Sequence, residues 1–164
     1  MKKLLLLRHA KSDKQAAGVS DFERPLNNRG KKAAALIGDY IAKRKIQPDL
    51  VLSSPAERAR QTAMLAGKAA GINVDLRFDE RIYEANASQL LKVVKQIDEA
   101  VSVALLVGHN PGFEDLLSDL TGHVRHMPTA ALAYLNINIE KWKDAAEGCA
   151  AIKWMVTPKE LQED

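Results

Sequence analysis

Arginine and histidine side chains directly follow the first apolar run of the chain. In LLLLRHAKSD, residues 4–13, this run ends at Arg8 and His9. The same residue types recur as Arg58 in SSPAERARQTA and His109 in LLVGHNPG. Guanidinium groups bind phosphate through paired N–H donors, and a neutral imidazole can act as a nucleophile. These four residues predict phosphoryl chemistry if the fold brings them together.

A histidine among arginines suits this chemistry because neighbouring positive charge lowers the pKa of an imidazole and keeps its lone pair free near pH 7. Phosphoryl transfer mainly requires in-line positioning and stabilisation of charge on the equatorial oxygens. We therefore expect His9 to attack phosphorus while Arg8 holds its oxygens. A cation such as Arg58 in a first helical turn opposes the helix dipole by about 0.3–1 kcal/mol unless an anion lies between them.

Short apolar runs alternate with stretches of helical periodicity, a pattern that favours a parallel α/β sheet. The expected strands cover residues 3–7, 50–52, 74–78 and 101–107. Near the C-terminus, YLNINI and CAAIKWMV predict two further strands, added antiparallel at the sheet edge. We predict one three-layer α/β/α domain over residues 1–164, with a mostly parallel central sheet and helices on both faces.

Helix signals lie between these runs. Apolar residues at helical spacing predict an amphipathic helix between NNRG and RKIQP: Ala33, Leu36, Ile37, Tyr40 and Ile41. A second helix is expected with Ser54 as its N-cap, Pro55 at its first position and Gly71 just past its end. Asn110 and Pro111 repeat the same start signal after the fourth run.

This topology gathers the polar residues at one edge of the sheet. The two arginines and two histidines follow the first, second and fourth expected strands, and Glu80 and Glu84 follow the third. In open α/β sheets ligands bind outside the carboxyl ends of the strands. The sequence therefore predicts a pocket for a compact dianion, with phosphate as the obvious candidate.

Composition excludes several other classes of protein. The net charge is +3 with acids and bases mixed, so no dense basic stripe indicates nucleic-acid or membrane binding. No apolar run approaches the roughly 20 residues of a membrane span, and the N-terminal run is too short for a signal peptide. The single cysteine, Cys149, predicts a cytosolic protein and a core-filling role. His123 and His126 form an H-x-x-H pair that we assign to a surface loop, and we expect a monomer.

The ordered motifs resemble the histidine phosphatases, a phosphoglycerate mutase-like superfamily marked by an Arg-His-Gly or Arg-His-Ala triplet after the first strand. The similarity continues through SDFERPLNNRG, LVLSSPAERARQTA, DERIYEA and LLVGHNPG to about residue 113. Within that superfamily, RHAKS and RPLNNRG are most similar to the SixA-type phosphohistidine phosphatases. The resemblance implies His9 as the phosphorylated nucleophile, Arg8 and Arg58 as phosphate clamps, His109 as a further donor, and no metal or other cofactor.

The resemblance leaves the general acid open. In larger relatives a glutamate after the third strand protonates the leaving oxygen, and Glu80 matches that position better than Glu84. Ser12 is expected to add a hydroxyl to the pocket, and Lys11 and Arg24 to line its rim. For these last three residues, a role as solvated loop side chains is an equally open interpretation.

The expected activity is that of a metal-independent phosphatase that acts on phosphohistidine in proteins through a covalent intermediate on His9. Hydrolysis of small phosphomonoesters by the same mechanism remains an alternative. So does a non-catalytic module that binds phosphate or carries a phosphoryl group. A metal-dependent phosphohydrolase using His9, His109 and a carboxylate is disfavoured because the sequence lacks a dense Asp/His ligand pattern.

Overall fold

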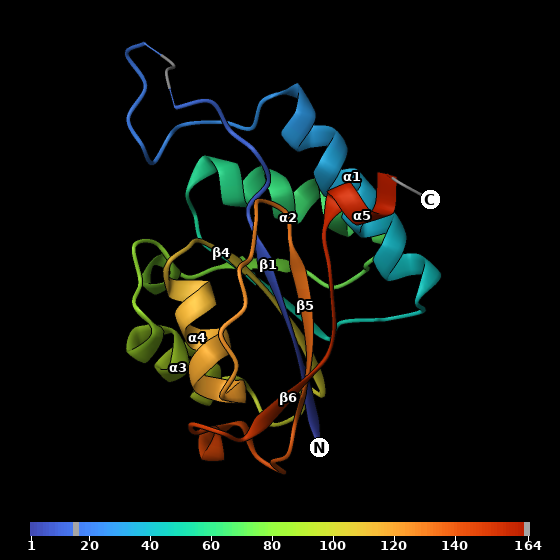
Figure 1. Ribbon diagram of the computed structural model, residues 1–164, viewed down its shortest axis with the longest axis vertical. Coiled ribbons are helices and arrows are strands. Elements are labelled where there is room, and N and C mark those ends of the chain that lie inside the picture. The colour runs from blue at the N-terminus through green and yellow to red at the C-terminus, as the bar shows by residue number, and fades with distance from the viewer. Residues whose placement is uncertain (15–16, 163–164) are drawn as a thin grey trace.

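A computed structural model describes residues 1–14 and 17–162 of the chain (Figure 1). Strands and helices alternate along most of its length, as the apolar runs predict. In chain order the elements are β1 Lys2–Arg8, α1 Asn28–Lys43, β2 Leu50–Ser53, α2 Glu57–Ala70, β3 Leu76–Phe78, the 3-10 turn η1 Glu80–Ile82, α3 Ala87–Lys95, β4 Val103–Gly108, α4 Gly112–Thr121, β5 Leu132–Ile137, the 3-10 turn η2 Trp142–Asp144, β6 Ala150–Val156 and α5 Pro158–Gln162.

The strands of the described residues form one six-stranded sheet in the order β3-β2-β4-β1-β5-β6. The first four strands in this order pair in parallel. At the other side β5 pairs antiparallel with β1, and β6 pairs antiparallel with β5. The mixed sheet confirms the predicted α/β class and the antiparallel additions at one edge.

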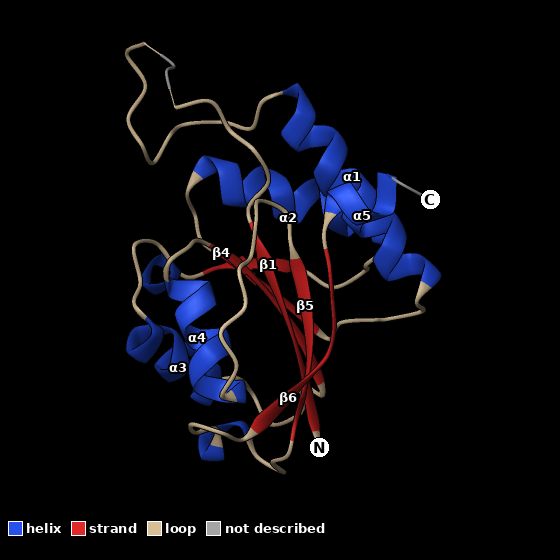
Figure 2. Ribbon diagram, viewed as in Figure 1, coloured by secondary structure: helices blue, strands red, loops and turns tan. Residues whose placement is uncertain are grey.

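Both faces of the sheet are covered by helices (Figure 2). Leu4 and Leu6 of β1 are buried in the core that includes residues of α3 and α4. Leu5 and Leu7 point to the opposite face and join the core that includes residues of α1 and α2. All four leucines are fully buried, which explains why β1 is continuously apolar instead of alternating.

The start predicted for α2 is wrong by a few residues. The helix begins at Glu57 with Ala56 as its N-cap, so Ser54 and Pro55 precede it. The Ser54 hydroxyl instead accepts a hydrogen bond from the Ala56 N–H at 3.2 Å, which closes a local turn before the helix. At the other end Gly71 adopts the left-handed conformation, as predicted for a C-cap glycine.

The helix α4 also begins later in the chain than predicted. Pro111 is the N-cap and Gly112 the first helical residue, so Asn110 does not cap the helix. Its side-chain amide donates to the Glu114 carboxylate at 2.8 Å and to the Met127 carbonyl at 2.9 Å. The polar side chain thus links α4 to the segment before β5.

Other boundaries differ in smaller ways. The helix α1 starts inside the NNRG motif, where the Asn27 side chain caps it by accepting from the Gly30 N–H. The strands β3 and β4 each start two residues later than predicted. Short apolar runs do not distinguish the loop that leads into a strand from the strand itself, because apolar residues such as Val74 and Val101 lie in these loops as well.

Two further predictions concern Cys149 and the pair His123 and His126. Cys149 is half-buried against the core that contains Leu4. His123 and His126 are exposed between α4 and β5, as expected for a loop.

Within the described residues, no three His, Cys, Asp or Glu side chains gather as metal ligands would. None of the described helices has the length and apolarity needed to cross a bilayer.

The helices α1 and α2 cross closely at Gly38. A Cβ atom on this residue would lie 2.3 Å from the Ala66 carbonyl oxygen, whereas one on Gly67 would have no neighbour within 4 Å. We expect Gly38→Ala to lower the free energy of unfolding by about 1–3 kcal/mol, as overpacking of a tight contact does. Urea unfolding of the purified protein measures this change.

Gly67→Ala is the matched control because it adds the same methyl group to a helix in open space. It should stabilise the protein by up to about 1 kcal/mol, since glycine is a poor helix former. If Gly38→Ala unfolded at the same urea concentration as the wild type, the close crossing of α1 and α2 would be wrong.

Candidate active site

The carboxyl ends of β1, β2 and β4 bring the two histidines and two arginines together. The parallel pairing of β1 and β4 aligns Arg8 with Gly108, and the His9 N–H continues it with a bond of 2.9 Å to the Gly108 carbonyl. The rings of His9 and His109 then lie 5.2 Å apart. Arg58 enters from the first turn of α2, and the exposed fractions of Arg58, His9 and His109 are only 6–9%.

The tautomer of His9 is set by its own backbone neighbour. Its Nδ1 lies 2.7 Å from the carbonyl oxygen of Ala10 and can only donate there, so Nε2 carries the free lone pair. Burial, opposed by the bond to the Ala10 carbonyl and helped by the charges of Arg58, Arg8 and Arg24, lowers the pKa of His9 to about 4. The imidazole is therefore neutral and nucleophilic near pH 7.

His109 has the complementary arrangement. Its Nε2 lies 2.7 Å from the Ser54 hydroxyl, which already accepts the Ala56 N–H. We assign the hydroxyl proton to this contact, which leaves the ring proton on Nδ1 as a donor. Burial lowers the pKa of His109 to about 3, with His9 and Arg58 adding to the effect. A neutral His109 can therefore still donate a hydrogen bond.

Only some of the N–H donors of Arg8 and Arg58 form hydrogen bonds within the described residues. Arg8 donates from Nη1 to the Met127 carbonyl at 3.0 Å. Arg58 donates to the Asp21 carbonyl at 2.8 Å and to its carboxylate at 3.2 Å. Among the described residues, Nε of both arginines and Nδ1 of His109 are buried without a hydrogen-bond partner. Buried donors of this kind are costly unless a ligand or water satisfies them, so they mark an anion site.

Sequence reasoning missed Asp21, the residue that organises the positive side of the site. Its carboxylate accepts from Tyr83 at 2.7 Å, from Arg24 at 3.0 Å and from Arg58. The Tyr83 hydroxyl, followed by Arg24 and Arg58, holds the pKa of Asp21 well below its usual range. The unfavourable place of Arg58 at a helix N-terminus was the available signal, because it required a nearby anion.

Tyr83 was missed as well, although it lies inside the DERIYEA motif. Its ring meets that of His109 edge-on, with centroids 5.6 Å apart. Burial and the Asp21 carboxylate raise the pKa of Tyr83 to about 12. The phenol therefore stays protonated and acts as a fixed donor to Asp21.

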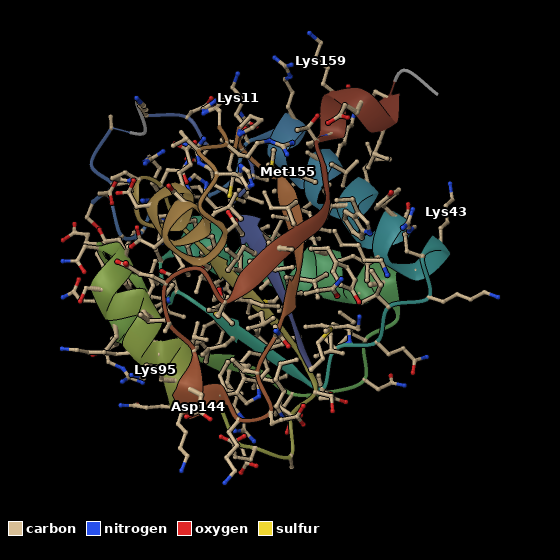
Figure 3. The ribbon with its side chains drawn as sticks, turned by 60° about the horizontal axis from the view of Figure 1, so that its bottom comes forward. Lys11, Lys43, Lys95, Asp144, Met155 and Lys159 are labelled. Carbon is tan, nitrogen blue, oxygen red and sulfur yellow. The ribbon has the colours of Figure 1, made fainter. Side chains whose placement is uncertain are left out.

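Of the three loop residues left open by the sequence, two belong to this cluster. Arg24 donates to the Ser12 hydroxyl as well as to Asp21, and its charge lowers the pKa of His9. The Lys11 side chain is exposed and projects from the surface (Figure 3). Ser12 and Arg24 thus lie at the site, whereas Lys11 points to solvent beside it.

Neither candidate acid is bound into the cluster. Glu80 lies in η1 and Glu84 just after it, and both side chains are exposed. Within the described residues, no hydrogen bond joins either carboxylate to the histidines or arginines. The Glu84 carboxylate adds to the raised pKa of Tyr83, the residue before it.

Backbone and hydroxyl contacts fix the segment that carries the nucleophile. The Ala130 N–H donates to the carbonyls of Arg8 at 3.1 Å and of His9 at 3.0 Å. On the other side, Thr62 accepts from the Ala10 N–H at 2.9 Å and donates to the Arg58 carbonyl at 2.7 Å. The site therefore combines a held nucleophile with preorganised donors, which is the arrangement phosphoryl transfer needs.

This fold and this constellation define a class of enzymes that form a covalent phosphohistidine. A comparison with protein families finds the same class, since residues 4–105 match the histidine phosphatase superfamily, branch 1. The chain belongs to this superfamily.

Individual relatives agree with this family. The chain is 32% identical to the uncharacterized protein Rv1276c of Mycobacterium tuberculosis, over 93% of this chain and all of that one. Among solved structures, the candidate phosphohistidine phosphatase SixA of Agrobacterium tumefaciens matches with a TM-score of 0.83 and 32% identity, covering 96% of this chain and 98% of that one. The corresponding protein of Nakamurella multipartitia matches with 0.84 and 26%, covering 96% of each chain. These matches confirm the resemblance to SixA-type proteins.

The lowered pKa values of the two histidines predict a pH-dependent stability. Unfolded histidines bind a proton near pH 6.5, whereas folded His9 and His109 bind one only near pH 4 and 3. The unfolded chain therefore holds more protons in this window, and the free energy of unfolding falls as the pH drops from 6.5 towards 4. Each proton contributes a slope of up to about 1.4 kcal/mol per pH unit.

Urea unfolding across this pH window measures the slope. The double variant His9→Gln, His109→Gln should have a shallower slope than the wild type, while the surface variant Lys95→Gln should keep it. An unchanged slope in the double variant would mean that the two rings are already charged in the folded protein.

Proposed function

We propose that this protein is a metal-independent phosphatase that removes phosphoryl groups from phosphohistidine in proteins through a covalent intermediate on His9. The observation that carries the proposal is the free Nε2 lone pair of His9 beside donors of Arg8, Arg58 and His109 that no described residue accepts. A site that only bound phosphate would not need an unprotonated imidazole among arginines.

In the first step Nε2 of His9 attacks phosphorus and forms a P–N bond as the bond to the leaving group breaks. The electron pair of that bond departs with the leaving group. Arg8, Arg58 and the Nδ1–H of His109 stabilise the charge on the equatorial oxygens. In the second step water attacks phosphorus and the electron pair of the breaking P–N bond returns to Nε2. The protons of the water leave with the phosphate, so His9 is neutral again.

A phosphohistidine substrate needs little help from a general acid. Its imidazole can already carry a proton near neutral pH, so the ring departs neutral. This suits a site in which Glu80 and Glu84 are exposed and, among the described residues, form no hydrogen bond with its histidines or arginines. The similarity to the Agrobacterium protein described as a phosphohistidine phosphatase supports the same substrate class.

The covalent intermediate can be trapped directly. Rapid quenching during turnover should leave a phosphoryl group on His9 that is stable in alkali and lost in acid, as a phosphoramidate is. Mass spectrometry of the quenched protein locates it. The variant His9→Gln should not be labelled, and chelators should change neither labelling nor turnover. Label on His109, or none, would overturn the assignment of the nucleophile.

The leaving group distinguishes the roles of the two glutamates. An alkyl phosphate expels a basic alkoxide, so a general acid typically accelerates its hydrolysis 10²–10⁴-fold. If Glu80 is the acid, Glu80→Gln should lower kcat/KM for alkyl phosphates far more than for phosphohistidine or 4-nitrophenyl phosphate. The measurement is the ratio of variant to wild-type kcat/KM for each substrate at fixed pH.

Glu84→Gln is the matched control, four residues farther along the chain. Equal losses on all three substrates in Glu80→Gln would show that Glu80 positions the phosphoryl group instead of donating a proton. A substrate-dependent loss found only in Glu84→Gln would assign the acid to Glu84.

A further inference from the structure

A second concave surface adjoins the candidate active site. A cavity of about 540 Å³ lies between the start of α1, the segment before β5 and α5. We call this cavity the basic groove, because the charged residues that line it are all cations: Lys11, Arg29, Lys32 and Lys159. Figure 3 shows Lys11 and Lys159 projecting from the same end of the molecule, away from Lys43 and Lys95.

The basic groove is a local concentration of positive charge. Its four side chains are exposed, and none forms an ion pair with a carboxylate of residues 1–14 or 17–162. The nearby carboxylate of Glu160 is occupied by hydrogen bonds from Thr157. The whole chain has a net charge of only +3, so the four cations form a local excess.

The start of α1 adds to this positive field. Its first turn holds no acidic residue, yet Arg29 and Lys32 lie within its first two turns. Cations at a helix N-terminus are unfavourable unless an anion lies close by. The Asp13 carboxylate, which accepts from the Asn27 side chain at 3.0 Å, supplies one negative charge against the four cations. The repulsion between these cations and the positive end of α1 is unfavourable in the free protein. An anionic partner bound at this surface would relieve it.

The basic groove shares its wall with the active site. Lys11 follows His9 and Ala10 directly, and its carbonyl is held by the Asn27 N–H at 3.0 Å. Thr129 lines the groove and precedes Ala130, whose N–H bonds the carbonyls of Arg8 and His9. A chain that presents a phosphorylated side chain to His9 can therefore lay its neighbouring residues across the groove.

We propose that the basic groove binds an acidic segment of the phosphoprotein substrate beside its phosphohistidine. The proposal rests on the proposed function and adds a chemical preference to it. Aspartate and glutamate side chains match the four exposed cations, and Thr129 also lines the groove. A concave groove flanked by Lys11 and Lys159 fits a peptide better than the broad surface of a bilayer. Electrostatic complementarity of this kind chiefly supplies specificity and a faster encounter.

Binding of an acidic peptide tests the groove without relying on catalysis. The probe is a fluorescent, unphosphorylated peptide of about ten residues rich in Asp and Glu, titrated at low salt, where screening is weak. The combined variant Arg29→Gln, Lys32→Gln, Lys159→Gln should weaken binding about tenfold, since several exposed charges act together. The control variant Lys43→Gln, Lys95→Gln, Lys143→Gln removes the same charge elsewhere and should change the Kd less than about twofold.

Equal weakening in the two variants would overturn the proposal, because only net charge would then matter. Tighter binding of phosphatidylserine vesicles than of the peptide would also overturn it, in favour of a lipid surface. With phosphohistidine peptides, the groove variant should raise KM for one with acidic flanks and leave that for neutral flanks unchanged. Turnover of 4-nitrophenyl phosphate should match the wild type, which shows that the catalytic site is intact.

Failure of the proposed function would give a different result. Neither phosphohistidine peptide would then be hydrolysed by the wild type, while acidic-peptide binding would still depend on Arg29, Lys32 and Lys159. That outcome would support the groove as a surface for acidic chains and reject phosphohistidine as the substrate.

Discussion

The parallel register of β1 and β4 fixes the position of His9 relative to His109. It aligns Arg8 with Gly108 and continues into the bond between the His9 N–H and the Gly108 carbonyl. A shift of one residue would turn every side chain of β1 to the opposite face and would move Lys3 or Arg8 into a core position that a leucine now fills. Core packing therefore specifies the geometry of the nucleophile and its neighbour.

The electrostatics of the site follow from this placement. Two neutral imidazoles lie in a buried region beside Arg8 and Arg58, and burial is the largest cause of their low pKa values. The charges of Arg8 and Arg58 repel one another, and Asp21 supplies a counterion to Arg58. Nε of both guanidinium groups has no partner among the described residues. A dianionic phosphoryl group can therefore join an already ordered set of charges, which limits reorganisation during the reaction.

The sequence predicted those parts of the molecule that depend on local pattern. The apolar runs predicted the strands, and the chemistry of Arg8, His9, Arg58 and His109 pointed to their shared edge. Residues that act through distant contacts were harder to find. Asp21 reaches Arg58 across 37 positions, and no spacing rule relates the two.

The two N-cap predictions at Ser54 and Asn110 failed for a related reason. Ser54 has the chemistry of an N-cap, but its hydroxyl is engaged by His109, 55 residues away. Asn110 likewise uses its amide on Glu114 and Met127 instead of a helix terminus. In both places a tertiary contact at the site overrides a local preference, as functional sites commonly do.

The burial of β1 in two cores also has a dynamic consequence. A strand with neighbours on both sides and helices over both faces exchanges its amide hydrogens only through large-scale opening of the domain. His9 extends from the end of this strand, so the nucleophile is anchored to one of the most slowly opening parts of the molecule. Groups that approach substrate from surface loops, such as Asp21 and Arg24, belong to segments with fewer buried contacts. The surface loops that carry Asp21 and Arg24 can therefore adjust to substrates of different shape, while Nε2 of His9 stays in position.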